Sequence, residues 1–153
     1  MIPVDAPILL DTNIILQLIR KNIVSQQLES DYKLISSPNH NLISYITVGE
    51  MYALSLKFCW GEQKIANLNT LLGAVVIVDI SGPSLANNYA QIDYFSGNII
   101  KPARPLGQND LWIAATATTL GAWLMTTDND FDHLHPQFIK RIKIDAKTGK
   151  TVN

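Results

Sequence analysis

Short apolar runs that alternate with stretches of helical periodicity constrain the fold of this chain more than any other feature of its sequence. Each run holds three to five residues, which suits a buried strand. The runs lie at residues 7–10, 42–46, 75–78, 123–126 and 142–144, and residues 42–46 could instead enter the helix that follows them. Strands separated by helices pair mainly in parallel, so the pattern predicts an α/β fold. We expect a mostly parallel sheet of four to five strands, covered by helices on both faces.

Helical spacing of apolar residues fills most of the sequence between these runs. It covers residues 14–19, 48–56, 65–72, 83–95 and 110–120. Residues 97–108 contain two glycines and two prolines and predict an irregular surface loop. The chain has 153 residues, which fits one domain. We predict that this domain spans residues 1–146 and that residues 147–153 form a polar, frayed tail.

Composition narrows the class of protein without identifying a function. A net charge of −1 argues against a uniformly basic surface for nucleic acid, although a local basic patch remains compatible with it. The single cysteine, Cys59, cannot form an internal disulfide and is interpreted as a core residue. No apolar run approaches the ~20 residues of a membrane span, and the N-terminus lacks the features of a secretion signal. We therefore expect a cytoplasmic protein that makes no membrane contact.

Four acidic residues fall at related positions of the predicted fold. Asp11 follows the first strand and Asp128 follows the fourth, while Asp110 opens a helix and Glu50 lies early in another. The carboxyl ends of parallel strands share one edge of a sheet, where ligands usually bind. Carboxylates gathered there would repel one another, and a hard cation such as Mg²⁺ or Mn²⁺ would relieve that repulsion. The pattern thus indicates a metal site.

Each acid also has a purely structural interpretation. Asp11 or Asp110 could cap its helix by accepting backbone hydrogen bonds. Thr47 and Glu50 have the spacing of a capping box. Residues 128–130, Asp-Asn-Asp, could form a turn. These interpretations account for the residues one at a time but not for their convergence on one edge.

Four sequence blocks together resemble the successive signatures of the PIN-domain nucleases, and especially those of VapC-type toxins. The blocks are Asp11-Thr12-Asn13, residues 44–50 ending in Glu50, residues 109–117 starting with Asn109-Asp110, and residues 126–131 around Asp128. Their order and approximate spacing match from about residue 8 to residue 144. The resemblance implies a three-layer α/β/α fold and metal-dependent cleavage of RNA. It also implies a homodimer that is inhibited by a small antitoxin protein. The long, proline-rich loop and the polar tail are departures that affect substrate access and partner contacts.

The resemblance assigns Asp11, Glu50, Asp110 and Asp128 as the catalytic acids, which would hold Mg²⁺ or Mn²⁺. We expect Asp11 and Asp128 to be the firmest ligands. Nearby polar residues would orient the carboxylates. The candidates are Thr12, Asn13, Asn109 and Thr126, with Asp130 as a weaker one. Asp79 is expected on the same edge, but no motif supports a role for it. Lys101, Arg104, Arg20 and Lys21 are candidates for contacts with RNA phosphates.

Other functions compete with a toxin nuclease. A housekeeping RNA-processing PIN nuclease would carry the same acids, whereas a non-catalytic PIN-fold module for protein binding would have lost some of them. A dehalogenase-like phosphatase would need an aspartate where Asn13 stands, and a receiver domain would need a lysine after a late strand. His133 and His135 could suggest a transition-metal site, but without a nearby cysteine we interpret them as part of an exposed loop.

Overall fold

The strands and helices alternate along the chain as the sequence predicts. The computed structural model describes residues 2–3, 5–37 and 41–153. In chain order the elements are β1 (Ile8–Leu10), α1 (Thr12–Arg20), α2 (Ile23–Tyr32), β2 (Asn41–Ser44), α3 (Tyr45–Lys57), α4 (Glu62–Ala74), β3 (Val76–Val78), α5 (Pro83–Tyr94), the π-helix η2 (Phe95–Ile99), α6 (Gln108–Leu120), β4 (Trp123–Thr126), the 3₁₀-helix η3 (Asp132–Leu134), β5 (Lys140–Ile144) and β6 (Thr151–Val152). The sequence left open whether residues 42–46 form a strand or enter the following helix. In the structure they complete β2 and then begin α3.

The sheet is mostly parallel, as predicted. Within the described residues it has six strands in the order β3-β2-β1-β4-β5-β6. All neighbouring strands pair in parallel except β5 and β6, which are antiparallel. The prediction of four to five strands is too low, because it did not include β6. Ile8 of β1 is in register with Asn41 of β2 on one side and with Trp123 of β4 on the other. The order of the strands along the chain therefore reverses between β1 and β4.

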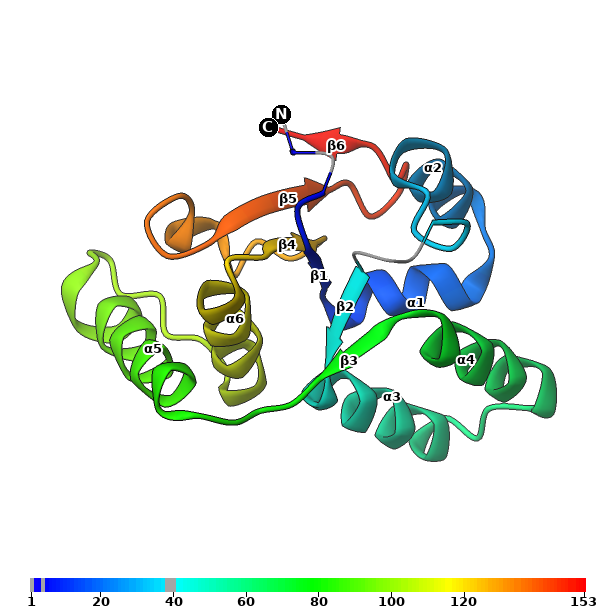
Figure 1. Cartoon of the computed structure of the whole chain (residues 1–153), viewed down its shortest axis with the longest axis horizontal. Coiled ribbons are helices and arrows are strands. Elements are labelled where there is room, and N and C mark those ends of the chain that lie inside the picture. The colour runs from blue at the N-terminus through cyan, green and yellow to red at the C-terminus, as the bar shows by residue number, and fades with distance from the viewer. Residues whose placement is uncertain (1, 4, 38–40) are drawn as a thin grey trace.

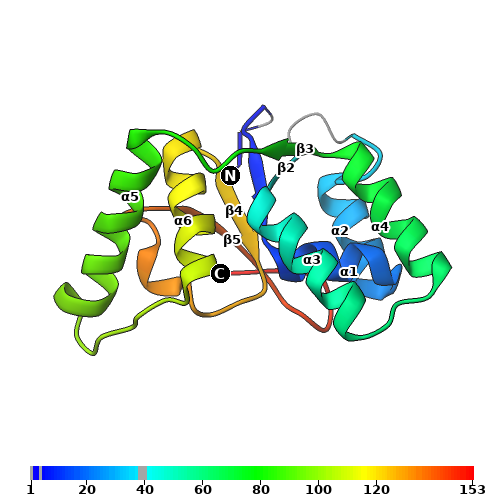
Figure 2. The same cartoon turned by 90° about the horizontal axis from the view of Figure 1, so that it is seen from below.

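Helices cover both faces of this sheet, which confirms the three-layer arrangement (Figures 1 and 2). One layer contains α1, α2 and α4 with part of α3, and the other contains α5 and α6. β1 serves both layers because successive side chains of a strand point to opposite faces. Ile8 and Leu10 belong to the first apolar cluster, whereas Leu9 belongs to the second.

Small buried residues hold α6 close to the sheet. Ala114, Ala115 and Ala117 are all buried in its contact face. The helix ends at Gly121, whose φ of +62° suits glycine, and the chain enters β4 two residues later. The C-terminal end of α6 thus lies at the start of β4. Its first turn, which carries Asp110, consequently lies toward the carboxyl edge of the sheet.

The C-terminal residues are part of the sheet and do not form the frayed tail that was predicted. Residues 147–149 form a turn in which the Asp145 carboxylate accepts hydrogen bonds from the backbone N–H groups of Lys147 and Thr148, at 3.0 and 2.8 Å. Gly149 completes the turn with φ of +75°. β6 then pairs with β5, and the hydroxyls of Thr151 and Tyr32 lie 2.5 Å apart. A hairpin therefore orders this end of the chain.

Two further segments differ from the expectations. The apolar pattern predicted no helix where α2 lies, because its buried apolar side chains are just Val24 and Leu28. The start of the predicted irregular loop is the end of η2, closed by a hydrogen bond of 3.0 Å from the N–H of Ile100 to the carbonyl of Phe95. Among the described residues, no helix is long and apolar enough to cross a membrane.

Candidate active site

Four carboxylates converge where the strand order reverses. We call Asp11, Glu50, Asp110 and Asp128 the acidic edge. Asp11 directly follows β1, and Asp128 lies two residues after the adjacent strand β4. Glu50 comes from α3, which follows β2, and Asp110 comes from the first turn of α6. In open α/β sheets, the crevice at such a reversal is the usual ligand site. The structure places the four acids toward this edge, and their joint role as a metal site stays a prediction.

Asp11 is the most buried and most firmly held of these acids. Its side chain is 3% exposed. Oδ1 accepts a hydrogen bond from the Thr12 N–H at 2.7 Å, and Oδ2 accepts one from the Thr126 hydroxyl at 2.8 Å. Burial raises its pKa to about 6, the two hydrogen bonds oppose this rise, and the charges of Asp128 and Glu50 add to it. Asp11 is also the N-cap of α1, so its structural and candidate roles coexist.

Thr12 links Asp11 to Glu50. Its hydroxyl donates a hydrogen bond of 2.7 Å to Oε1 of Glu50, and it lies 3.1 Å from the Thr47 hydroxyl. The capping-box interpretation of Thr47 is wrong, because the N-cap of α3 is Ser44, whose side chain accepts from the Ile46 N–H. Thr47 instead lies fully buried beside the Thr12–Glu50 pair. Sequence reasoning missed this role of Thr47.

Asp128 shares a threonine with Asp11. The Thr126 hydroxyl, which donates to Asp11, accepts a hydrogen bond of 2.9 Å from the Asp128 N–H. The Asp130 N–H donates to Oδ1 of Asp128 at 2.9 Å, so the predicted turn at residues 128–130 is present. The Lys143 ammonium supports this turn by donating to the Asp128 carbonyl at 2.9 Å and to the side chain of Asn129. The turn therefore fixes the orientation of the Asp128 carboxylate and leaves it partly exposed.

Asp110 is held differently from the other acids. The N-cap of α6 is Gly107, so Asp110 does not cap its helix. Among the described residues, its carboxylate accepts no hydrogen bond, and it is only partly buried. Its pKa is raised to about 7, mainly by burial and then by the charges of Asp11, Asp128, Glu50 and Asp130. The other three acids therefore lie close enough to Asp110 for their charges to act on it.

The other predicted polar residues divide into two groups. Thr12 and Thr126 contact the carboxylates directly, and Asp130 is exposed but close enough to influence Asp110. Neither Asn13 nor Asn109 donates to these carboxylates within the described part of the chain, and their orienting role stays a prediction.

The predicted phosphate-binding cations do not all lie near the acidic edge. Arg104 donates a hydrogen bond of 3.1 Å to the carbonyl of Asn129, next to Asp128. Arg20 and Lys21 lie at the C-terminal end of α1, on the order of 13 Å from Asp11, because a helix rises 1.5 Å per residue. Lys101 is exposed in the loop that also carries Arg104. The geometry thus favours Arg104 over the others.

Three further sequence interpretations need correction. His133 is not part of an exposed loop, because it lies in η3, is partly buried and pairs with the Ser96 hydroxyl at 2.7 Å. Asp79 does not join the other acids but lines a separate cavity with Thr119 and Leu120, at the far end of α6. Cys59 is exposed and is not a core residue.

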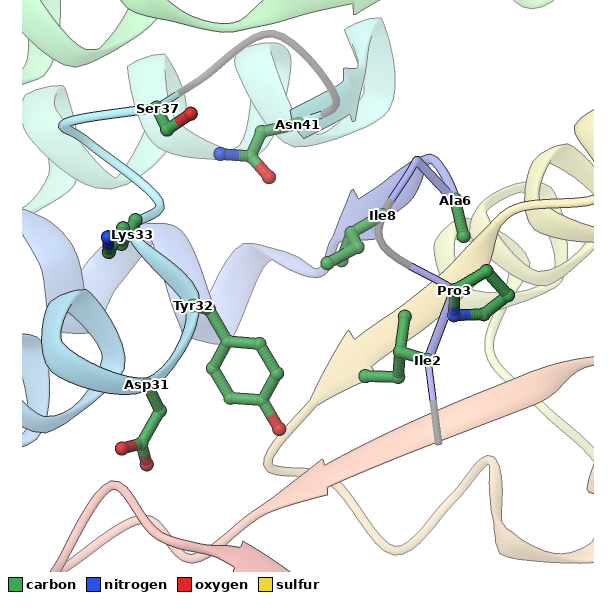
Figure 3. A pocket seen from close by; sticks show the side chains of 9 residues that line it. All are labelled: Ile2, Pro3, Ala6, Ile8, Asp31, Tyr32, Lys33, Ser37 and Asn41. Carbon is green, nitrogen blue, oxygen red and sulfur yellow. The ribbon is translucent and has the colours of Figure 1, made fainter.

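A hollow of about 320 Å³ lies away from the acidic edge. Figure 3 shows the side chains that line it. It is lined by Ile8 at the start of β1, by Tyr32 of α2 and by Asn41 of β2, among others. Asp11 follows the other end of β1, and none of the four acids lines this hollow. The acidic edge is therefore the better candidate for chemistry.

The donor set of the acidic edge fits a hydrated divalent cation. Within the described residues, no group of three or more Asp, Glu, His or Cys side chains is arranged to hold a metal ion. Mg²⁺, however, usually keeps several waters and is bound through one or two carboxylates. Burial is the main cause of the raised pKa values of Asp11 and Asp110, and the neighbouring carboxylates, whose charge a cation would offset, raise them as well. Direct ligation by all four acids stays a prediction.

Comparison with known proteins agrees with this geometry. A family model described as PIN domain matches residues 8–135. Ribonuclease VapC1 of Haemophilus influenzae is 32% identical over 125 residues, which cover 77% of this chain and 84% of that protein. Ribonuclease VapC2 of the same species is 28% identical over 120 residues, which cover 78% and 85%. A chain in the crystal structure of VapBC2 from Rickettsia felis, bound to a promoter DNA fragment, superposes with a TM-score of 0.69 at 26% identity and covers 88% of this chain and 97% of its own length.

Proposed function

This chain belongs to the PIN-domain family, and on that basis we propose that it is an endoribonuclease that depends on Mg²⁺ or Mn²⁺ and acts as the toxin of a toxin–antitoxin pair. The observation that carries the nuclease proposal is the convergence of Asp11, Glu50, Asp110 and Asp128 at the strand-order reversal. The similarity to proteins named ribonuclease VapC supports RNA as the substrate. A cytoplasmic location follows from that substrate.

In this proposal, Asp11 and Asp128 hold the cation. Their positions are coupled because the Thr126 hydroxyl contacts the Asp11 carboxylate and the Asp128 backbone. When bound, the cation would activate a water molecule and stabilise negative charge on the leaving oxygen of a phosphodiester. The water oxygen forms a new bond to phosphorus while the bond to the leaving oxygen breaks.

Glu50 and Asp110 complete the site, either as further ligands or by accepting hydrogen bonds from water. The Thr12 hydroxyl fixes one oxygen of Glu50 and so limits its rotation. Asp110 has no fixed hydrogen-bond partner among the described residues, which leaves its carboxylate free to rotate toward substrate and cation. Asp130 is exposed at the rim and would add negative charge without being a required ligand.

We also propose a homodimer and a small antitoxin as partners. The solved VapBC structures of similar proteins support a paired toxin. The chain itself offers apolar contact surface near the end of α3, where Leu56 is 80% exposed and Phe58 is 62% exposed. Leu54 and Trp60, by contrast, pack partly against the core. An antitoxin tail with Arg or Lys would suit the acidic edge, because its cation can pair with the carboxylates.

Purified protein mixed with RNA, with and without Mn²⁺, tests the nuclease. We expect cleavage with Mn²⁺ or Mg²⁺ and none with excess chelator. Cleavage that persists unchanged in chelator would rule out the metal mechanism. No cleavage of any RNA would favour a non-catalytic binding module.

Expression of the chain alone, and together with the neighbouring short reading frame, tests the toxin role. The chain alone should slow growth, and the neighbour's product should relieve the arrest. An active nuclease that neither slows growth nor binds the neighbour would instead be a housekeeping RNA-processing enzyme.

A further inference from the structure

The loop between η2 and α6 is anchored at its base to the segment that carries Asp128. The N–H of Arg104 donates a hydrogen bond of 2.8 Å to the carbonyl of Ser96, which is fully buried. The Ser96 hydroxyl pairs with Nε2 of His133 at 2.7 Å. The Phe95 ring packs 5.0 Å from the Phe138 ring. These contacts fix the backbone of the loop at Arg104.

The side chain of Arg104 extends from this anchor toward the acidic edge. Its guanidinium donates a hydrogen bond of 3.1 Å to the carbonyl of Asn129, the residue after Asp128. Its proximity to this segment also shows in His133, whose pKa is lowered by burial and then by the Arg104 charge. The Arg104 guanidinium is therefore held beside the turn at residues 128–130.

Arg104 differs from the neighbouring cations in its pairing. Arg141 and Lys143 both form ion pairs with Asp132. In the part of the chain that the structure describes, Arg104 forms no ion pair and its guanidinium makes just the one hydrogen bond to Asn129. A guanidinium carries five N–H donors, so most of those on Arg104 face solvent.

We propose that Arg104 binds a phosphate of the RNA next to the one that is cleaved, and so sets the affinity for substrate. This inference rests on the proposed ribonuclease function. An RNA strand on the acidic edge is repelled by Asp110, Asp128 and Asp130, and a fixed cation at the rim offsets that repulsion. Arginine suits this role because its planar fork can donate two parallel hydrogen bonds to one phosphate.

If its role were purely structural, Arg104 would serve just to hold the Asn129 carbonyl in place through their hydrogen bond. Arg104→Gln separates the two roles, since glutamine keeps an N–H donor for that carbonyl but lacks the charge. Arg104→Lys keeps the charge and loses the fork. Lys33→Gln is the matched control, because it removes one exposed positive charge beside the hollow that lies away from the acidic edge.

The test combines the kinetics of RNA cleavage with binding of a fluorescent single-stranded RNA in an Asp11→Asn background at several salt concentrations. We expect Arg104→Gln to raise KM about tenfold with kcat nearly unchanged, as for the loss of one charge-assisted contact. The slope of log affinity against log salt should become shallower by about 0.7, the value for one phosphate on a single strand. Arg104→Lys should retain the slope and part of the affinity, and Lys33→Gln should match the parent protein.

Three results would overturn the inference, and they differ in what they say about the nuclease. Equal KM and equal salt slope in Arg104→Gln and in a wild-type protein that cleaves RNA would exclude a phosphate contact and leave the nuclease intact. A drop in kcat alone would do the same and assign Arg104 to positioning of the turn. If the wild-type protein neither cleaves nor binds RNA, both the inference and the proposed function fail.

Discussion

Asp11 and Asp110 present carboxylates to the same edge of the sheet from regions that are built differently. The β1–α1 turn buries Asp11 and fixes both of its oxygens, through Thr12 and Thr126. The first turn of α6 leaves Asp110 partly exposed and, among the described residues, without a hydrogen bond to its side chain. Both pKa values are raised, to about 6 and about 7, but hydrogen bonds oppose the rise just at Asp11.

This difference suggests a division of labour within one site. A carboxylate with fixed oxygens can hold a cation in a constant position, because little rotational freedom is lost on binding. A carboxylate without fixed partners can adjust to substrate and water. Changes at the β1–α1 turn should therefore affect catalysis most, whereas changes at Asp110 should also appear as changes in stability.

The largest effect is expected from Asp11→Asn. Loss of a ligand that positions the metal should lower the rate of metal-dependent RNA cleavage by at least ~100-fold. The fold should survive, because asparagine is also a good helix N-cap. Rates of RNA cleavage and a thermal melt check both parts. Asp79→Asn is the control, since Asp79 lies outside the acidic edge, and equal activity in the two variants would refute the role of Asp11.

A smaller loss is expected from Thr126→Val. This change removes the donor to Asp11 and the acceptor for the Asp128 N–H while nearly keeping the side-chain volume. Partners of this kind typically contribute about 10–100-fold to activity or metal affinity. The loss should appear in the Mn²⁺ concentration needed for half-maximal cleavage. Thr119→Val is a matched change at an exposed site, and if both variants need the same Mn²⁺ concentration, then Thr126 does not orient the site.

The smallest effect is a pH-dependent gain in stability from Asp110→Asn in the presence of chelator. A carboxyl group whose folded pKa is raised stabilises the fold at low pH, and this contribution is lost as pH rises through the folded value. For Asp110, the loss runs from the unfolded value near 3.8 up to about 7. We therefore expect the variant to melt about 2–4 °C higher than wild type at pH 8, or roughly 1 kcal/mol after allowance for solvent screening, and by less than half that margin at pH 5, where just the first part of the loss has occurred. The same difference at both pH values would mean that charge repulsion is not its cause.

Local sequence signals were enough to predict the strands and the positions of the acids. The apolar runs mark β1 and β4, and Asp11 and Asp128 follow them directly, so the shared edge could be inferred from topology. β6 was missed because its two residues carry no apolar run. The Asp145 turn and Gly149 were the available signal for a hairpin.

Contacts between distant segments were beyond sequence reasoning. Thr47 had the spacing of a capping box, but Ser44 caps α3, and the position of Thr47 beside Thr12 depends on how α1 packs against α3. Lys143 supports the Asp128 turn from the neighbouring strand β5, a contact for which the sequence carries no signal. Such roles depend on tertiary packing, which local patterns do not encode.

Calorimetric titration of Mn²⁺ into the purified protein tests most directly whether the acidic edge is one shared metal site. Wild-type protein should bind Mn²⁺ and release protons on binding, because Asp11 and Asp110 are partly protonated near neutral pH. Asp11→Asn and Asp128→Asn should each weaken binding by at least ~10-fold, and Asp79→Asn should leave it unchanged. If wild type shows no Mn²⁺ binding at millimolar concentrations, or if all three variants bind as wild type does, the shared metal site is contradicted.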